Sequence, residues 1–448
     1  MEKRTRGQVK NGMITAALLM FMGFCIMLYC EWRGNLPDTL YVCRKMLWVM
    51  PVFFILTAMA HGSAGKGLSG REYAVRMFCG ARTSGGRKVY MDYARVFAAV
   101  MVILTHACSM QADADAPMWK TNLLLCCAAI GLVCNPLYVM ISGSLLLSSE
   151  KEESLGTFYF RRFVKIVIPM VVYYVIFLCI SGQISLIPPR NLKEGALQIL
   201  AGASGIVPHY WLIYILISLY VTAPFIRVMV RNLKDSSIKV LFFLILAEEA
   251  VTAYLPLAGV QTGFAMNLAG WEGVFILGYI VTERRTKWME RLVLIFGAVS
   301  AVMIAVAAVI DYSFMAYISN TAPVMVLFAA AVLILLSKFE RVLRGKLPSV
   351  VQALSKYSYS IILVHWYGLF VVTWGKIGVQ PLRFGCIGGI VLTVLTAVIV
   401  CFVLGFAADH TVVLVVQKAV EGIGGLIRRL GGRKSGLSGS SDHQGQAE

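Results

Sequence analysis

The chain consists of long apolar runs separated by short polar segments. A run of about 20 apolar residues is long enough to cross a bilayer as one helix, and about twelve such runs occur here. They cover approximately residues 13–30, 41–60, 92–110, 122–147, 162–181, 210–230, 238–258, 268–282, 288–310, 321–337, 358–375 and 384–408. This pattern predicts an all-α polytopic membrane protein.

The first apolar run resembles a signal peptide because it follows the basic residues Lys3, Arg4 and Arg6. No small-residue cleavage site follows it, however, and the chain continues with Glu31 and Trp32. We therefore expect the run to be retained as the first membrane span.

Basic residues are concentrated in alternate connections between the runs. The positive-inside rule places such connections in the cytoplasm, and it predicts that both termini are cytoplasmic and that the number of spans is even. The basic connections carry Lys66, Arg71, Arg76, Arg82, Arg87 and Lys88, then Arg161, Arg162 and Lys165, then Arg227, Arg231, Lys234 and Lys239, then Arg284, Arg285, Lys287 and Arg291, and then Lys338, Arg341, Arg344, Lys346 and Lys356.

Composition narrows the class of protein further. Of the 448 residues, 58% are hydrophobic and only 14% are charged, which excludes a disordered chain, a secreted disulfide scaffold and an ordinary cytosolic enzyme. The net charge is +18, but the basic residues are spread between apolar runs, so we expect no nucleic-acid partner. Most of the 11 cysteines lie within the runs without CxxC spacing, which predicts neither a disulfide framework nor a metal site.

The same pattern divides the chain into four parts. We expect two N-terminal transmembrane helices in residues 1–60 and a basic cytoplasmic loop in 61–88. Residues 89–410 are expected to form a core of ten membrane helices. Residues 411–448 mix apolar and basic positions and then become polar, which is typical of an amphipathic segment followed by a disordered tail.

Ionisable residues within a membrane span are costly, so they are candidates for function. The third run contains Asp92, Arg95 and His106. Arg95 and His106 are eleven positions apart, which puts them about 20° apart around the helix and roughly 16 Å apart along it. An arginine can hold phosphates, and a histidine can act as a general base. Alternatively, Arg95 anchors the helix at the interface and His106 is a packing residue.

Five segments together resemble acyltransferase family 3, whose members are integral-membrane acyltransferases. The first is the segment from Asp92 to His106. The others are Asn135 to Leu146 with Ser142-Gly143, Phe158 to Pro169, His209 to Pro224, and Ser358 to His365. Lys165, Leu212 and Ile362 depart from the family pattern, which usually has Arg, an aromatic residue and Tyr at these positions. The resemblance covers about residues 88–408.

The resemblance implies transfer of an acyl group from cytoplasmic acyl-CoA, commonly acetyl-CoA, to a hydroxyl of a surface glycan, a lipid-linked sugar or a small molecule. We expect a bacterial inner-membrane location and, from the cysteine spacing, no metal. His106 would be the general base or a transient acyl carrier, and Asp92 would orient Arg95. Further residues implied to line the site are, for CoA phosphates, Arg161, Arg162 and Lys165, and, for the acceptor, His209, Trp211, Tyr359 and His365.

Two other functions fit the same sequence features. A twelve-span secondary transporter would also have basic inner loops, and a membrane sensor or assembly partner could use the N-terminal helices without catalysis. Glu248, Glu249 and Glu272 fall within the apolar runs and would be costly if they faced lipid. We expect them to neutralise core arginines; the alternative is a direct catalytic role.

Overall fold

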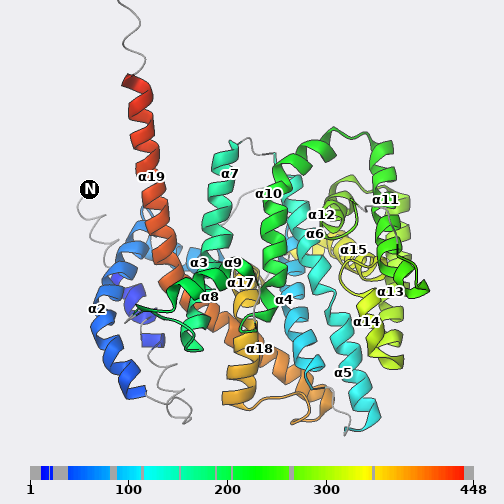
Figure 1. The fold of residues 1–448 in the computed structure, drawn as a ribbon, viewed down its shortest axis with the longest axis horizontal. Coiled ribbons are helices and arrows are strands. Elements are labelled where there is room, and N and C mark those ends of the chain that lie inside the picture. Colours follow the sequence, from blue (N-terminus) through cyan, green and yellow to red (C-terminus); the bar gives the residue numbers. More distant parts are fainter. Residues whose placement is uncertain are drawn as a thin grey trace, which may run out of the picture. The chain divides into compact units, whose positions relative to one another are not determined.

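The computed structural model describes residues 12–19, 21–23, 39–80, 88–111, 116–150, 153–186, 189–202, 205–261, 267–345 and 349–437, and these residues are almost entirely helical (Figure 1). In chain order the elements are α2 (Thr39–Ala64), α3 (Gly70–Cys79), α4 (Tyr90–Ser109), α5 (Met118–Gly131), α6 (Cys134–Leu147), α7 (Leu155–Arg162), η1 (Phe163–Val167), α8 (Ile168–Ile180), β1 (Ser185–Leu186), β2 (Pro189–Arg190), α9 (Leu192–Ala201), η2 (Pro208–Tyr210), α10 (Trp211–Asn232), α11 (Asp235–Tyr254), η3 (Leu255–Ala258), α12 (Trp271–Tyr279), η4 (Ile280–Arg284), α13 (Lys287–Ile310), η5 (Tyr312–Phe314), α14 (Met315–Ile318), α15 (Pro323–Lys338), α16 (Glu340–Gly345), α17 (Ser349–Trp366), η6 (Tyr367–Ile377), α18 (Cys386–Ala408), η7 (Asp409–Val413) and α19 (Leu414–Leu437).

Eight helical segments of the described residues are long and apolar enough to cross a membrane. A ninth is possible if the pair Tyr312–Ile318 and Pro323–Lys338, bent by 76°, counts as one span. These nine correspond to nine of the ten runs expected in the core. The tenth run, 268–282, is only the nine residues of α12 and the five of η4. The polypeptide is thus an all-α membrane protein, and the even span number remains a prediction.

The two N-terminal spans are less complete. The first, 13–30, lies partly outside the described residues, of which 12–19 and 21–23 are helical. The second corresponds to α2, whose apolar part, Pro51–Ala64, is shorter than a full span.

Residues 61–88, expected to form a basic cytoplasmic loop, contain helical structure: α2 continues to Ala64 and α3 occupies Gly70–Cys79. Their cytoplasmic location stays a prediction. A capping box explains the start of α3. Glu72 N–H donates to Ser69 Oγ, and the Ser69 N–H donates to Glu72 Oε2 at 2.9 Å. Within the C-terminal segment 411–448, α19 extends to Leu437, and residues 438–448 lie outside the described part.

The chain forms two compact units. Unit 1 contains the described residues of 1–73, 156–172 and 407–448, and unit 2 those of 74–155 and 173–406. Within unit 1, His61 is 1% exposed and its ring lies parallel to that of His410. His61 also contacts the Tyr73 hydroxyl and the His410 carbonyl. Helix α19 is attached to η1 by a hydrogen bond from Gln417 to the Val164 carbonyl.

Unit 2 depends on a close crossing of α6 and α12. A Cβ atom on Gly143 would lie 1.8 Å from the Phe275 carbonyl oxygen, and one on Gly278 would lie 2.2 Å from the Met140 carbonyl oxygen. Only glycine leaves room for two backbones to approach this closely, as in small-residue interfaces between membrane helices. The short antiparallel pair β1–β2 connects α8 to α9.

Replacing Gly278 by alanine should destabilise unit 2, because the new methyl group would meet the α6 backbone rather than a flexible side chain. Overpacking of this kind costs about 1–3 kcal/mol, so we expect a thermal midpoint several degrees lower for the purified protein in nanodiscs. The matched control is Gly388→Ala in α18, where an added Cβ meets nothing within 4 Å. An equal effect of both substitutions would contradict the close crossing.

Candidate active site

Helix α4 carries Asp92, Arg95 and His106, and its first turn is fixed by a distant carboxylate. Glu340 accepts hydrogen bonds from the backbone N–H groups of Val89 at 3.0 Å and Tyr90 at 2.7 Å. These N–H groups have no partner within the helix, and a negative charge there also interacts favourably with the helix dipole. The start of α4 is therefore fixed against α16.

Asp92 connects α4 to α17. Its side chain is nearly buried and accepts a hydrogen bond from the Ser355 hydroxyl at 2.7 Å. Its Oδ1 also lies 3.4 Å from a terminal nitrogen of Arg95, whose side chain is 32% exposed. Because the carboxylate is fixed by Ser355, it can orient the guanidinium while leaving part of it accessible. Sequence reasoning missed Ser355.

Three histidines from distant parts of the chain meet near the other end of α4. The ring of His106 stacks on that of His365, with centroids 5.2 Å apart and planes inclined by 21°. His209, in η2, lies edge-on to His365 at 4.6 Å. Trp366 touches both outer members: its ring is edge-on to His106 at 5.4 Å and nearly parallel to His209 at 6.0 Å. We call His106, His209, His365 and Trp366 the histidine cluster.

The members of the histidine cluster differ in their surroundings. His365 is 1% exposed and its Nδ1 lies 2.7 Å from the Ile362 carbonyl oxygen. His209 is 7% exposed and its Nε2 lies 3.1 Å from the Leu363 carbonyl oxygen. His106, by contrast, is only half-buried. It is therefore the histidine best placed to meet a reactant.

A change of helix type immediately follows His365. Helix α17 ends at Trp366, and the wider π-helical segment η6 begins at Tyr367. Such segments occur often at functional sites. The rings of Trp366 at the end of α17 and of Phe370 and Trp374 in η6 succeed one another, with centroids 4.6 Å and 4.8 Å apart. Sequence reasoning missed Trp366, although its position directly after His365 was a usable signal.

A family model described as an acyltransferase domain matches residues 88–406. The chain belongs to this acyltransferase family. The match contains Asp92, Arg95 and the whole histidine cluster, and it confirms the family predicted from the five motifs. Together with the apolar helices of the described residues, it makes the chain a multi-pass membrane acyltransferase. No curated protein and no solved structure matched the chain.

The other predicted site residues of the acyltransferase are not members of the histidine cluster. Trp211 pairs its ring with Trp271 at 5.6 Å. Tyr359 precedes His365 by six positions in α17, which places it about 120° away around the helix. The basic residues proposed for CoA phosphates, Arg161, Arg162 and Lys165, belong to unit 1.

The carboxylates of α11 bind loop backbone, and within the described part of the chain no ion pair joins them to an arginine, contrary to the expectation. Glu248 accepts hydrogen bonds from the N–H groups of Leu268 and Ala269, and Glu249 accepts one from Gly270 at 2.6 Å. Gly270 has φ 96° and directly precedes α12. These bonds fix the loop from which the short helix α12 begins.

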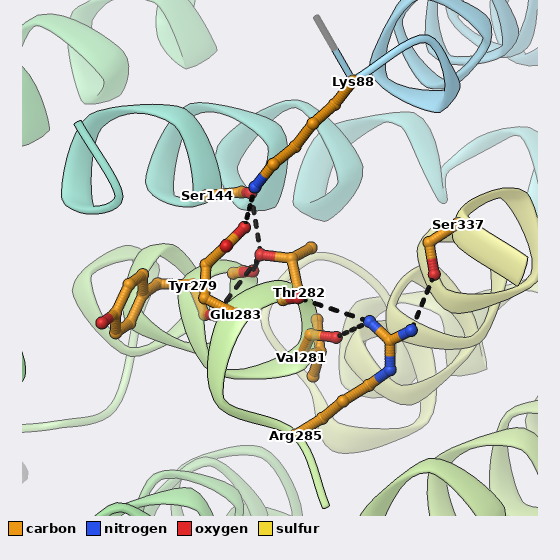
Figure 2. Close-up of polar contacts among 9 residues, drawn as sticks. Lys88, Ser144, Tyr279, Val281, Thr282, Glu283, Arg285 and Ser337 are labelled. Carbon is orange, nitrogen blue, oxygen red and sulfur yellow. Dashed lines mark hydrogen bonds and ion pairs between the residues drawn. The ribbon is translucent and has the colours of Figure 1, made fainter. Parts of the chain in front are cut away.

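One end of unit 2 gathers six cations and several carboxylates that pair with them, where the helices of Figure 2 meet. Lys88 pairs with Glu283, Ser144 contacts Thr282 at 2.8 Å, and the Arg285 guanidinium donates to Ser337 at 3.0 Å and to the Val281 carbonyl. The basic end is defined by Lys88, Arg227, Arg231, Arg284, Arg285 and Lys338. Helix α4 runs from this end toward the histidine cluster.

Removing the Asp92 carboxylate should destabilise the acyltransferase. Asp92→Ala leaves the buried Ser355 hydroxyl without its acceptor, which costs about 1–3 kcal/mol. The control is Asp235→Ala, because Asp235 also pairs with an arginine but its side chain is 80% exposed. An exposed pair contributes about 0–1 kcal/mol. We expect the thermal midpoint in nanodiscs to fall clearly more for Asp92→Ala; equal shifts would contradict the buried role.

Proposed function

We propose that this acyltransferase moves an acyl group, commonly acetyl, from cytoplasmic acyl-CoA to a hydroxyl of an acceptor on the opposite side of a bacterial inner membrane. The observation that carries the proposal is that one helix, α4, holds a partly exposed guanidinium toward the basic end and a half-buried imidazole in the histidine cluster. The two functional groups are roughly 16 Å apart along the helix. The acceptor is a surface glycan, a lipid-linked sugar or a small molecule.

The basic end is suited to the donor. CoA carries phosphate groups, and a guanidinium binds phosphate through parallel N–H donors. Arg95 is oriented by Asp92 and remains partly exposed, so it can position the donor while the thioester extends toward His106. Arg161, Arg162 and Lys165 are further candidates for the CoA phosphates.

The histidine cluster is suited to the chemical step. His106 removes the proton from the acceptor hydroxyl while the oxygen attacks the thioester carbonyl carbon. The carbon–sulfur bond then breaks, and the imidazolium returns the proton to the departing thiolate, so that ester and free thiol are formed and the histidine is regenerated. His365 stacks on the His106 ring and the Trp366 ring packs nearly perpendicular to it, so the two side chains hold the His106 ring in place.

Membership of the acyltransferase family favours this reaction over the transporter and the non-catalytic partner that the sequence left open. A transporter or a non-catalytic partner would carry the same basic connections, so these connections do not distinguish the three functions.

Replacing His106 by alanine should abolish most of the transfer. A positioned general base contributes about 10²–10⁴-fold to the rate, so we expect at least about a hundredfold less labelled acetyl, supplied as acetyl-CoA, in cell-surface material. The mutant must be inserted and expressed like the wild type, as judged by its thermal midpoint. Undiminished incorporation by such a mutant would refute the role of His106.

Replacing Arg95 by alanine should instead weaken the use of the donor. Loss of a charged hydrogen bond to phosphate corresponds to roughly a tenfold to hundredfold loss of affinity, and we expect it in the KM for acetyl-CoA. Lys338→Ala is the control, because Lys338 is also a cation of the basic end but pairs with Glu290 at 2.8 Å. A similar increase in KM for both variants would show that charge alone, rather than a site at Arg95, is responsible.

A further inference from the structure

Two nitrogens of the histidine cluster are buried and have no hydrogen-bond partner among the residues that the structure describes. They are Nδ1 of His209 and Nε2 of His365. Buried polar atoms in proteins are nearly always paired, so each exception calls for an explanation. Both residues lie in the site proposed for the acceptor, and the inference below rests on that proposed function.

The second nitrogen of each ring fixes which tautomer is present. His365 Nδ1 faces the Ile362 carbonyl, and His209 Nε2 faces the Leu363 carbonyl. A carbonyl oxygen can only accept, so the proton of each neutral imidazole is on the nitrogen that faces it. His365 Nε2 and His209 Nδ1 then carry a lone pair and no proton. Both unpartnered atoms are therefore hydrogen-bond acceptors.

We propose that His209 Nδ1 and His365 Nε2 accept hydrogen bonds from neutral hydroxyl groups of the acceptor that neighbour the one acylated at His106. The site would thus take an uncharged, polyhydroxylated part of the acceptor. Carboxylate and phosphate groups have no proton to donate at neutral pH, and their negative charge would face two lone pairs. A site built to bind hydroxyls strongly disfavours analogues that lack them.

Amide isosteres separate the acceptor role from a purely structural one. In length, the terminal amide of asparagine corresponds to Nδ1 of histidine, and that of glutamine to Nε2. His365→Gln therefore keeps an oxygen acceptor in the place of Nε2, whereas His365→Asn keeps only the N–H directed at Ile362. For His209 the two replacements exchange roles, because Nε2 is the atom that contacts Leu363. His209→Asn keeps an oxygen acceptor in the place of Nδ1, whereas His209→Gln keeps only the N–H directed at Leu363.

The proposal consequently predicts an alternating pattern of activity in the full-length protein. All four variants lose a ring contact of the histidine cluster, so the comparison is made within each pair. With labelled acetyl-CoA and membranes that contain the natural acceptor, His365→Gln should keep at least about tenfold more transfer than His365→Asn, and His209→Asn at least about tenfold more than His209→Gln, as expected for a hydrogen bond in a buried site. If the histidines serve only to anchor the backbone, His365→Asn and His209→Gln should be the more active variants. That result, or equal loss in all four variants, would overturn the proposal.

The tautomers can also be measured without any activity. The chain has only six histidines, so ¹⁵N-histidine spectra of the protein in nanodiscs can be assigned by single substitutions. We expect a protonated Nδ1 in His365 and a protonated Nε2 in His209. The opposite tautomer, or a doubly protonated ring, in either residue would overturn the proposal while leaving the proposed acyl transfer intact.

The labelled product gives the third measurement. Mass spectrometry should place the acyl group on an oxygen whose neighbouring carbons bear free hydroxyls. A carboxylate or phosphate on those carbons would overturn the inference. If the wild type transfers no label at all, the proposed function itself fails, and the spectra still report on the two nitrogens.

Discussion

The structure depends on one constraint: inside an apolar unit, each backbone N–H and C=O group must find a partner in the protein. Helices satisfy most of these groups internally, but their ends do not. In unit 2, side chains from other helices supply the missing partners. Glu340 accepts from the start of α4, and Arg227 and Arg231 donate to the Leu146 and Leu147 carbonyls at the end of α6. Charged residues thus connect the ends of helices that are far apart in the sequence.

This use of charge changes how the basic residues are understood. The positive-inside rule accounts for their distribution along the sequence, but it does not say what they touch. Arg227 and Arg231 each direct Nε at a backbone carbonyl, whereas Arg284 and Arg285 each bind a carboxylate. Residues that orient a membrane protein in the bilayer therefore also hold its helices together.

Properties local to one helix could be predicted from the sequence. The common face of Arg95 and His106 follows from 100° of rotation per residue, and both lie in the single helix α4. The start of α3 was also encoded locally, in Ser69 and Glu72, but the many glycines and basic residues around them suggested a loop.

Properties that depend on packing between helices could not be predicted in this way. His106, His209 and His365 are more than 100 positions apart in sequence from one to the next, and only the fold brings their rings within 6 Å. The partners of Glu248 and Glu249 are the backbone of residues 268–270, and a backbone partner leaves no signature in side-chain chemistry. The family resemblance pointed to the three histidines, but it gave no information on the partners of Glu248 and Glu249.

The crossing of α6 and α12 has a mechanical consequence. Gly143 faces Phe275 while Gly278 faces Met140, so a step of three residues back along one helix matches a step of three forward along the other. The two antiparallel backbones therefore approach each other closely at two reciprocal positions. Sliding either helix by a turn would bring a side chain against the opposing backbone. Whatever rearrangement accompanies turnover, α6 and α12 must move through it as a single body.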